Sequence, residues 1–176
     1  MVRRINNFTL QKQIGSFSAG QELLFSGTVY MLRDQAHKRL LDAIRMRKKL
    51  PFDLKGQIIY YCGPTKTPPG KIIGSCGPTT SSRMDSFTPS LLRCGIKGMI
   101  GKGARSAQVI DAIRRFKAVY FLAPAGCGAL LAKKVKKVTL IAYVDLGPEA
   151  IRRCEVKDFP LIVGIDASGR SIYDTK

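Results

Sequence analysis

Short apolar runs alternate with amphipathic segments along most of the chain. Runs that are rich in β-branched and aromatic residues and bounded by Gly or Pro are typical of strands, whereas apolar residues spaced three and four apart are typical of helices. Strands are predicted over residues 22–32, 57–62, 72–76, 98–100, 118–123, 138–147 and 159–166, with a final edge strand within 168–174. Helices are predicted over residues 34–50, 86–95, 106–116 and 126–135, with one or two helical turns within 148–156.

Local signals indicate where several of these elements begin, end or bend. Asp34 and Thr88 stand at the predicted starts of the first two helices, and both residue types are good N-caps. Pro51 follows the first helix and is expected to stop it. Gly27 interrupts the first strand and predicts a β-bulge there.

Apolar strands that alternate with helices predict the α/β fold class, with a sheet covered on both faces. The 176 residues, of which 45% are hydrophobic, suffice for one domain with a sizeable core. Neither an internal repeat nor a linker interrupts the pattern. We therefore expect residues 1–176 to form a single domain.

The formal net charge of +18 favours an anionic partner, which could be nucleic acid, a membrane surface, an acidic chain or a small substrate. Two basic runs, 45–49 and 133–137, lie near predicted helix ends, where the helix dipole already favours cations. Phe and Tyr lie within apolar strands rather than among the basic residues, and no RNA-binding signature is present. Nucleic acid is therefore an unfavoured alternative.

The apolar runs, the first residues and the cysteine content indicate the cellular location and the metal chemistry to expect. No apolar run approaches the ~20 residues that span a bilayer, and the first residues lack a secretory signal, so a cytoplasmic protein without a membrane partner is expected. The five cysteines form no CxxC pair, and there is one histidine. We expect most cysteines to be small buried residues and this chain to hold no zinc or iron–sulfur ligand set.

Polar turns occur at three predicted junctions from strand to helix. They are Arg33-Asp34 with His37 one turn later, the hydroxyl-rich stretch 77–84, and the glycine-rich stretch 101–105. Ligands of open α/β sheets bind outside the carboxyl ends of strands, and helix N-termini attract anions. Arg33, Arg83 and Lys102 therefore predict a pocket for a ligand with more than one negative group.

Each turn also has a simpler interpretation. Arg33-Asp34 could be a helix cap with a surface charge, and His37 could bond only a backbone carbonyl. The hydroxyl groups of 77–84 could bond their own backbone, and 101–105 could be a flexible loop. The shared topological position of the three turns favours a joint role.

Two stretches resemble nucleotide-binding motifs but lack required residues. Ile96 and Gly103 stand where a P-loop needs Gly and Ser or Thr, respectively. In 126–131, Leu131 replaces the third glycine of a dinucleotide fingerprint. The sequence therefore argues against a nucleotide ligand.

The polar turns belong to longer motifs that resemble the β subunit, or C-terminal domain, of class I iron–sulfur fumarate hydratases and tartrate dehydratases. The matching stretches are 26–40, which contains RDQAH; 58–92, which contains GPTTSSRM; 98–103, which contains IGKG; 144–151; and 156–174. Together they cover most of the chain, and the three short motifs in combination are specific.

The resemblance implies a swivelling β/β/α three-layer domain. It also implies an α subunit that supplies three cysteines to a [4Fe–4S] cluster, and a higher αβ oligomer. The implied reaction is the reversible dehydration of a 2-hydroxy dicarboxylate, and we expect (S)-malate and fumarate. Tartrate and mesaconate are alternative substrates. A purely structural role, without any part in catalysis, is an alternative for the subunit itself. An acidic α subunit is expected to account for the high positive charge.

The resemblance also implies roles for individual residues in binding the substrate. Arg33 matches an arginine that binds a substrate carboxylate, and Arg83 and Lys102 match the other cationic contacts. Arg83 is expected to clamp a carboxylate bidentately. Thr80 and Gly101, in the same motifs, are expected to line the substrate site.

The catalytic roles implied by the resemblance fall on three residues. Thr79 matches a threonine proposed to abstract a proton, which requires that Arg83 and Lys102 stabilise its alkoxide. Asp34 is expected to orient Arg33 or His37. His37 is expected at the active site, and the proton donor is expected in the other subunit.

Overall fold

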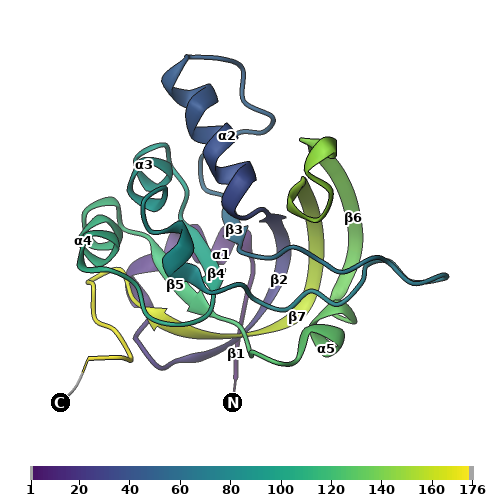
Figure 1. The fold of residues 1–176 in the computed structure, drawn as a ribbon. Helices are drawn as coiled ribbons and strands as arrows, with labels where there is room; N and C mark the ends of the chain where they lie inside the picture. Colours follow the sequence, from purple (N-terminus) through teal and green to yellow (C-terminus); the bar gives the residue numbers. More distant parts are fainter. Residues whose placement is uncertain (1, 175–176) are drawn as a thin grey trace.

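A mixed sheet that curls round on itself organises residues 2–174, the part of the chain that this computed structural model describes (Figure 1). Its strands are β1 (Arg3–Ile5), β2 (Glu22–Met31), β3 (Ile58–Tyr60), β4 (Gly98–Gly101), β5 (Val119–Leu122), β6 (Val135–Ala142) and β7 (Ile151–Ile165). The α-helices are α1 (Asn7–Gln13), α2 (Asp34–Arg45), α3 (Thr88–Arg93), α4 (Ala107–Phe116) and α5 (Gly128–Ala132). Short 3-10 helices are η1 (Ile14–Ser16), η2 (Ser81–Met84) and η3 (Val144–Glu149).

The sheet closes into a small barrel through its last strand. Strands β2, β3, β4 and β5 are parallel neighbours in that order, and β7 runs antiparallel to both β5 and β2. Strands β1 and β6 extend the sheet at the sides of β2 and β7. The α/β class is confirmed, and the sheet forms a closed barrel rather than an open layer.

Side chains that alternate along the strands fill two separate cores. In the segment that contains β3, Ile58, Tyr60 and Cys62 belong to the core inside the barrel, whereas Ile59 and Tyr61 belong to the core outside it. Helices α2, α3 and α4 cover this outer face (Figure 1). We expected other elements to cover both faces of the sheet. Helices cover the outer face, whereas the side chains of the inner face pack mainly against one another inside the barrel.

The bulge predicted in β2 is confirmed and has a visible cause. The pairing register with β7 shifts between Phe25 and Gly27. Asn7 of α1 accepts from the Thr28 amide at 2.7 Å and donates to the Thr28 carbonyl at 2.9 Å. A Cβ at Gly27 would lie 2.1 Å from the Asn7 side-chain oxygen, so glycine allows this close approach.

Two predicted strands are wrong, and one segment expected to be helical is a strand. Residues 72–76 pair with a neighbouring loop instead of the sheet. The Thr65 amide donates to the Ser75 carbonyl, the Ser75 amide donates to Thr65 Oγ1, and Gly74 packs directly on Thr65. The segment 168–174 forms only a bridge from Ser171 to β7. Residues from 151 onward belong to β7, because pairing with β2 and β6 outweighs the weak helical pattern there.

The helix ends also differ from expectation. Helix α2 ends at Arg45, well before Pro51, and the chain leaves it through Arg47 in the left-handed conformation. Asp34 and Thr88 are the first helical residues rather than N-caps. Their side chains are drawn into tertiary contacts instead. Within residues 2–174, no helix combines the length and apolar character that crossing a membrane requires.

Candidate functional site

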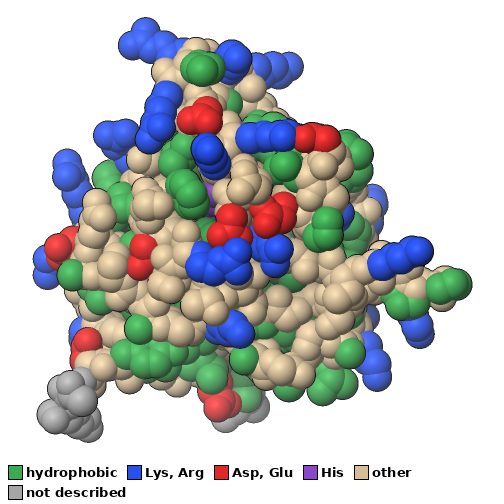
Figure 2. All heavy atoms as spheres, viewed as in Figure 1, with side chains coloured by type: hydrophobic (Ala, Val, Ile, Leu, Met, Phe, Trp, Pro, Cys, Tyr) green, Lys and Arg blue, Asp and Glu red, His purple; other side chains and the backbone are tan. Residues whose placement is uncertain are grey.

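The three polar turns meet at one edge of the sheet. The first and third turns directly follow the parallel strands β2 and β4. The second turn follows no strand, and its Thr79 amide binds the carbonyl of Tyr61, the residue after β3, which lies between β2 and β4. An ion pair between Arg83 and Asp34 joins the first turn to the second. A parallel β-bridge between the backbones of Thr80 and Lys102 joins the second turn to the third. Figure 2 shows basic and acidic side chains side by side below the N-terminal end of α2. The expected gathering of the three turns is therefore present.

Arg33 is held at the start of α2 by acidic neighbours. Its Nε donates to Glu149 Oε1 at 3.2 Å and lies 3.9 Å from Asp34 Oδ2. The Arg33 side chain is 28% exposed to solvent. A Cβ at Gly63 would lie 3.1 Å from Arg33 Nε, so the glycine leaves room beside the guanidinium. Sequence reasoning missed Glu149, although it lies in the matching stretch 144–151.

Asp34 holds Arg83 in a two-point ion pair. Arg83 Nε lies 3.0 Å from Oδ1, and Arg83 Nη2 lies 2.8 Å from Oδ2. Asp34 therefore orients Arg83 more closely than Arg33. Its carboxylate also acts on His37 by charge, since it opposes the lowering of the His37 pKa by burial. One edge of the Arg83 guanidinium is taken up, and its Nη1–Nη2 edge remains for another anion. The Arg83 side chain is 52% exposed.

The second turn is fixed mainly through its backbone. The Thr79 amide donates to the Tyr61 carbonyl at 2.7 Å, which places the half-buried Thr79 just beyond β3. Thr80 is exposed, and the Ser81 amide donates to the Lys102 carbonyl at 3.0 Å. The hydroxyl run thus combines a tightly bonded turn with two exposed residues, Thr80 and Ser82, beside the half-buried Thr79 and the buried Ser81.

Gly101 allows the second and third turns to touch. A Cβ at this position would lie 1.9 Å from Ser81 Oγ, which accepts from the Lys102 amide at 3.1 Å. The Tyr120 hydroxyl lies 2.9 Å from the same oxygen and donates to the Gly103 carbonyl at 2.8 Å. The Lys102 side chain makes no salt bridge with the residues that the structure describes.

His37 lies completely buried beneath these turns. Its Nδ1 is 2.9 Å from the Arg33 carbonyl, which can only accept, so Nδ1 carries the proton. Nε2 has no partner within residues 2–174, and Tyr61 and Phe87 pack around the ring. Burial lowers the pKa of His37 to about 4, which keeps the imidazole neutral near pH 7. The simpler interpretation, a bond to a backbone carbonyl, describes the contact observed.

A buried arginine that the sequence analysis did not single out binds the second and third turns from below. Arg105 Nε donates to Asp85 at 2.7 Å, and its Nη2 donates to Thr88 at 2.7 Å. Its guanidinium lies over the rings of Tyr61 and Tyr120. The signal was its position at the end of the glycine-rich turn, directly before a helix.

Three of the five cysteines, Cys62, Cys76 and Cys154, are buried thiols, and Cys94 and Cys127 are partly exposed. Burial raises the pKa of each buried thiol, to about 11 for Cys76 and about 12 for Cys154, so they are protonated near pH 7. Among residues 2–174, no group of three His, Cys, Asp or Glu side chains is placed to hold a metal ion.

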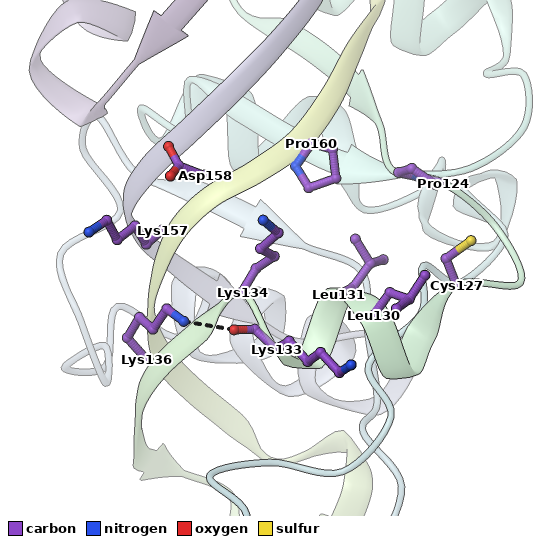
Figure 3. Close-up of a pocket in the computed structure, with 10 residues that line it drawn as sticks. All are labelled: Pro124, Cys127, Leu130, Leu131, Lys133, Lys134, Lys136, Lys157, Asp158 and Pro160. Atoms are coloured by element: carbon purple, nitrogen blue, oxygen red, sulfur yellow. Dashed lines mark hydrogen bonds between the residues drawn. The ribbon is translucent and has the colours of Figure 1, made fainter.

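A separate hollow of about 650 Å³ lies beside α5 and shares no residue with the three turns (Figure 3). Leu130 and Leu131 form part of its wall, and Cys127 lies at one end. Lys134 points into it, whereas the Lys136 ammonium is bound to the Lys133 carbonyl at 2.8 Å. The candidate site is therefore an open edge of polar turns rather than this hollow.

Comparison with known proteins identifies clear relatives. A family model described as Fumarase C-terminus matches residues 2–176. The chain is 37% identical to a putative L(+)-tartrate dehydratase subunit beta of Methanocaldococcus jannaschii, over 96% of this chain and 89% of that one. It is 35% identical to the L(+)-tartrate dehydratase subunit beta of Escherichia coli, over 87% and 77%. It is 39% identical to the anaerobic class I fumarate hydratase of E. coli, over 92% of this chain but only 30% of that protein.

Proposed function

The chain belongs to the Fumarase C-terminus family, and we propose that it is the β subunit of a hydro-lyase that interconverts (S)-malate and fumarate. The observation that supports this most is the contact, at one edge of the sheet, among the three turns that carry Arg33, Arg83 and Lys102. A dicarboxylate needs at least two anchored cations, and guanidinium groups match carboxylates geometrically.

The two arginines would bind substrate carboxylates through edges that the chain leaves unused. Glu149 takes Arg33 Nε, and Asp34 takes one edge of Arg83. Both guanidinium groups are thereby oriented before substrate arrives, which lowers the entropic cost of positioning it. Their two acidic partners balance their charge, so Lys102 supplies the unbalanced positive charge for the dianion.

Thr79 is the proposed proton-abstracting group. Its amide donates to the Tyr61 carbonyl, and the backbone of its neighbour Thr80 forms a β-bridge with that of Lys102. A threonine hydroxyl is a weak base, so this role depends on nearby positive charge from Arg83 and Lys102 to stabilise the alkoxide. The proton donor is proposed to lie in the partner subunit.

Asp34 and His37 act in this proposal as positioning residues rather than as groups that touch substrate. Asp34 fixes the guanidinium of Arg83. His37, neutral and buried, donates to the Arg33 carbonyl and so supports the first turn from beneath. Thr80 and Gly101 shape the edge of the site.

A partner is part of the proposal. The relatives named subunit beta belong, by their names, to enzymes with another subunit. Because residues 2–174 contain no group of three side chains placed to hold a metal ion, we propose that an α subunit holds the [4Fe–4S] cluster. A higher αβ assembly, a cytoplasmic location and a swivelling three-layer arrangement are proposed on the same family basis.

Tartrate is the second candidate substrate, because two of the relatives are named tartrate dehydratase subunits. Identities of 35–39% to both kinds of relative do not separate the two activities. Mesaconate would use the same carboxylate contacts. A basic nucleic-acid-binding protein is the alternative from another class, and it predicts binding that weakens steeply with salt.

The test is an anaerobic one. The chain is co-purified with its candidate α subunit, the cluster is reconstituted, and malate, tartrate and mesaconate conversion is followed by ultraviolet absorbance, with the chain alone as control. Conversion of malate by the complex, and not by the isolated chain, supports the proposal. Conversion of tartrate or mesaconate instead supports a hydro-lyase subunit but contradicts the malate assignment. No conversion of any of them in the presence of an intact cluster contradicts it.

A further inference from the structure

A strap of residues 143–150 connects β6 to β7 and lies beside the N-terminal end of α2 (Figure 1). It includes η3, and it turns through left-handed conformations at Tyr143 and Gly147. Two acidic side chains of the strap contact α2. Asp145 pairs with Arg39 on the exposed side, at 2.8 and 2.5 Å. Glu149 reaches the first turn of the candidate site.

Glu149 uses each of its oxygens for a different group. Oε1 accepts from Arg33 Nε at 3.2 Å, and Oε2 accepts from the Gln35 amide at 2.8 Å. The Gln35 amide is one of the free N–H groups at the start of α2. The Glu149 side chain is only 17% exposed. One carboxylate therefore ties the guanidinium of Arg33 to the backbone of the helix that carries it.

The backbone on either side of Glu149 is itself fixed. The Arg152 guanidinium donates to the carbonyls of Gly147, Pro148 and Ala150, at 2.8, 3.1 and 3.0 Å. Three carbonyls gathered on one guanidinium leave the strap little freedom next to Glu149. The Glu149 carboxylate is therefore carried by a fixed backbone, unlike the carboxylate of a mobile surface loop.

We propose that Glu149 is a positioning residue for the reaction, which holds Arg33 through Nε and leaves its Nη1–Nη2 edge for a substrate carboxylate. This inference rests on the proposed function. Gly63 supports it, because a larger residue would press on the same guanidinium. Asp34 does not replace Glu149, since it lies 3.9 Å from Arg33 Nε and is committed to Arg83.

The test compares Glu149→Gln with Asp145→Asn, which alters the outer contact of the same strap. In the reconstituted complex with (S)-malate, Glu149→Gln should raise KM about tenfold, equivalent to about 1.4 kcal/mol, with a much smaller change in kcat. Asp145→Asn should leave both constants unchanged. Equal effects of the two variants, or an unchanged KM in Glu149→Gln, would overturn the proposal.

A second measurement separates this inference from the proposed function. In the full ¹⁵N-labelled chain without substrate, the Arg33 Nε–H resonance should shift and exchange faster in Glu149→Gln, and should be unchanged in Asp145→Asn. Thermal unfolding verifies that both variants are folded. If the wild-type complex converts no dicarboxylate, the proposed function fails, while this resonance still shows whether Glu149 holds Arg33. An unchanged resonance in folded Glu149→Gln contradicts the inference directly.

Discussion

Arg83 and Asp34 lie 49 positions apart in the chain and form a two-point ion pair, with distances of 3.0 and 2.8 Å. The pair connects the hydroxyl-rich turn to the first residue of α2. It therefore decides the direction in which the Arg83 guanidinium presents its remaining edge.

Asp34→Asn should weaken substrate binding more than folding. The amide keeps the shape of the side chain but cannot pair two oxygens with Arg83, so the guanidinium loses its fixed direction. We expect kcat/KM of the complex to fall about 10- to 100-fold, equivalent to about 1.4–2.8 kcal/mol. Because Arg83 is half exposed, the free energy of unfolding should fall by only about 1 kcal/mol or less.

Asp111→Asn is the matched control for this change. Asp111 pairs with Arg114 on the exposed side of α4, away from the three turns. Urea unfolding and steady-state kinetics should both be near wild type. A loss of kcat/KM in Asp111→Asn as large as that in Asp34→Asn would refute a specific role for Asp34.

Stability should depend on pH through His37. Its pKa is lowered from 6.5 to about 4 by burial, so the unfolded chain binds more protons than the folded chain between these values. The contribution is present in full above pH 6.5 and is lost as the pH falls towards 4. Its size is on the order of 3 kcal/mol, since one pKa unit corresponds to about 1.4 kcal/mol.

The pH dependence can be assigned with one variant. His37→Asn retains an N–H that can reach the Arg33 carbonyl but cannot titrate. Urea unfolding at several values from pH 4 to 7 should give a flatter profile for this variant than for the wild type. If the two profiles have the same slope, the acid sensitivity comes from other groups.

Gly101→Ala should separate the second and third turns. The new Cβ would lie 1.9 Å from Ser81 Oγ and 2.9 Å from the Tyr61 ring, so the backbone must move. Overpacking of this kind costs about 1–3 kcal/mol, and activity of the complex should fall as Lys102 shifts. Gly15→Ala, where the added carbon meets nothing within 4 Å, should show neither effect. Thermal unfolding and kinetics of the two variants provide the comparison.

The sequence predicted the meeting of the three polar turns better than the contacts between them. Glycines, prolines and helix starts are local signals, so the turns at Arg33, 77–84 and 101–105 were predictable. Glu149 was not, because it meets Arg33 across 116 positions of the chain. The contacts of Arg105 likewise come from separate parts of the chain, with Asp85 after η2, Thr88 in α3 and Tyr120 in β5.

Fold errors arose where tertiary pairing outweighs local pattern. The apolar stretch 72–76 resembles a strand. In the structure Gly74 packs directly on Thr65, and the stretch is part of a loop that is bonded to Thr65 rather than to the sheet. Helix α1 was missed although Asn6 and Thr9 form a capping box at its start. Barrel closure could not be inferred, because it depends on β7 reaching both β2 and β5.

The most direct test of the central claim is the effect of Arg83→Ala on malate and fumarate interconversion by the reconstituted complex. Arg114→Ala, which changes an exposed arginine of α4, is the control. We predict that Arg83→Ala lowers kcat/KM by at least about 100-fold, equivalent to about 2.8 kcal/mol, while the control matches wild type. Wild-type kcat/KM in folded Arg83→Ala would show that the polar turns do not bind the substrate and that this chain has only a structural role.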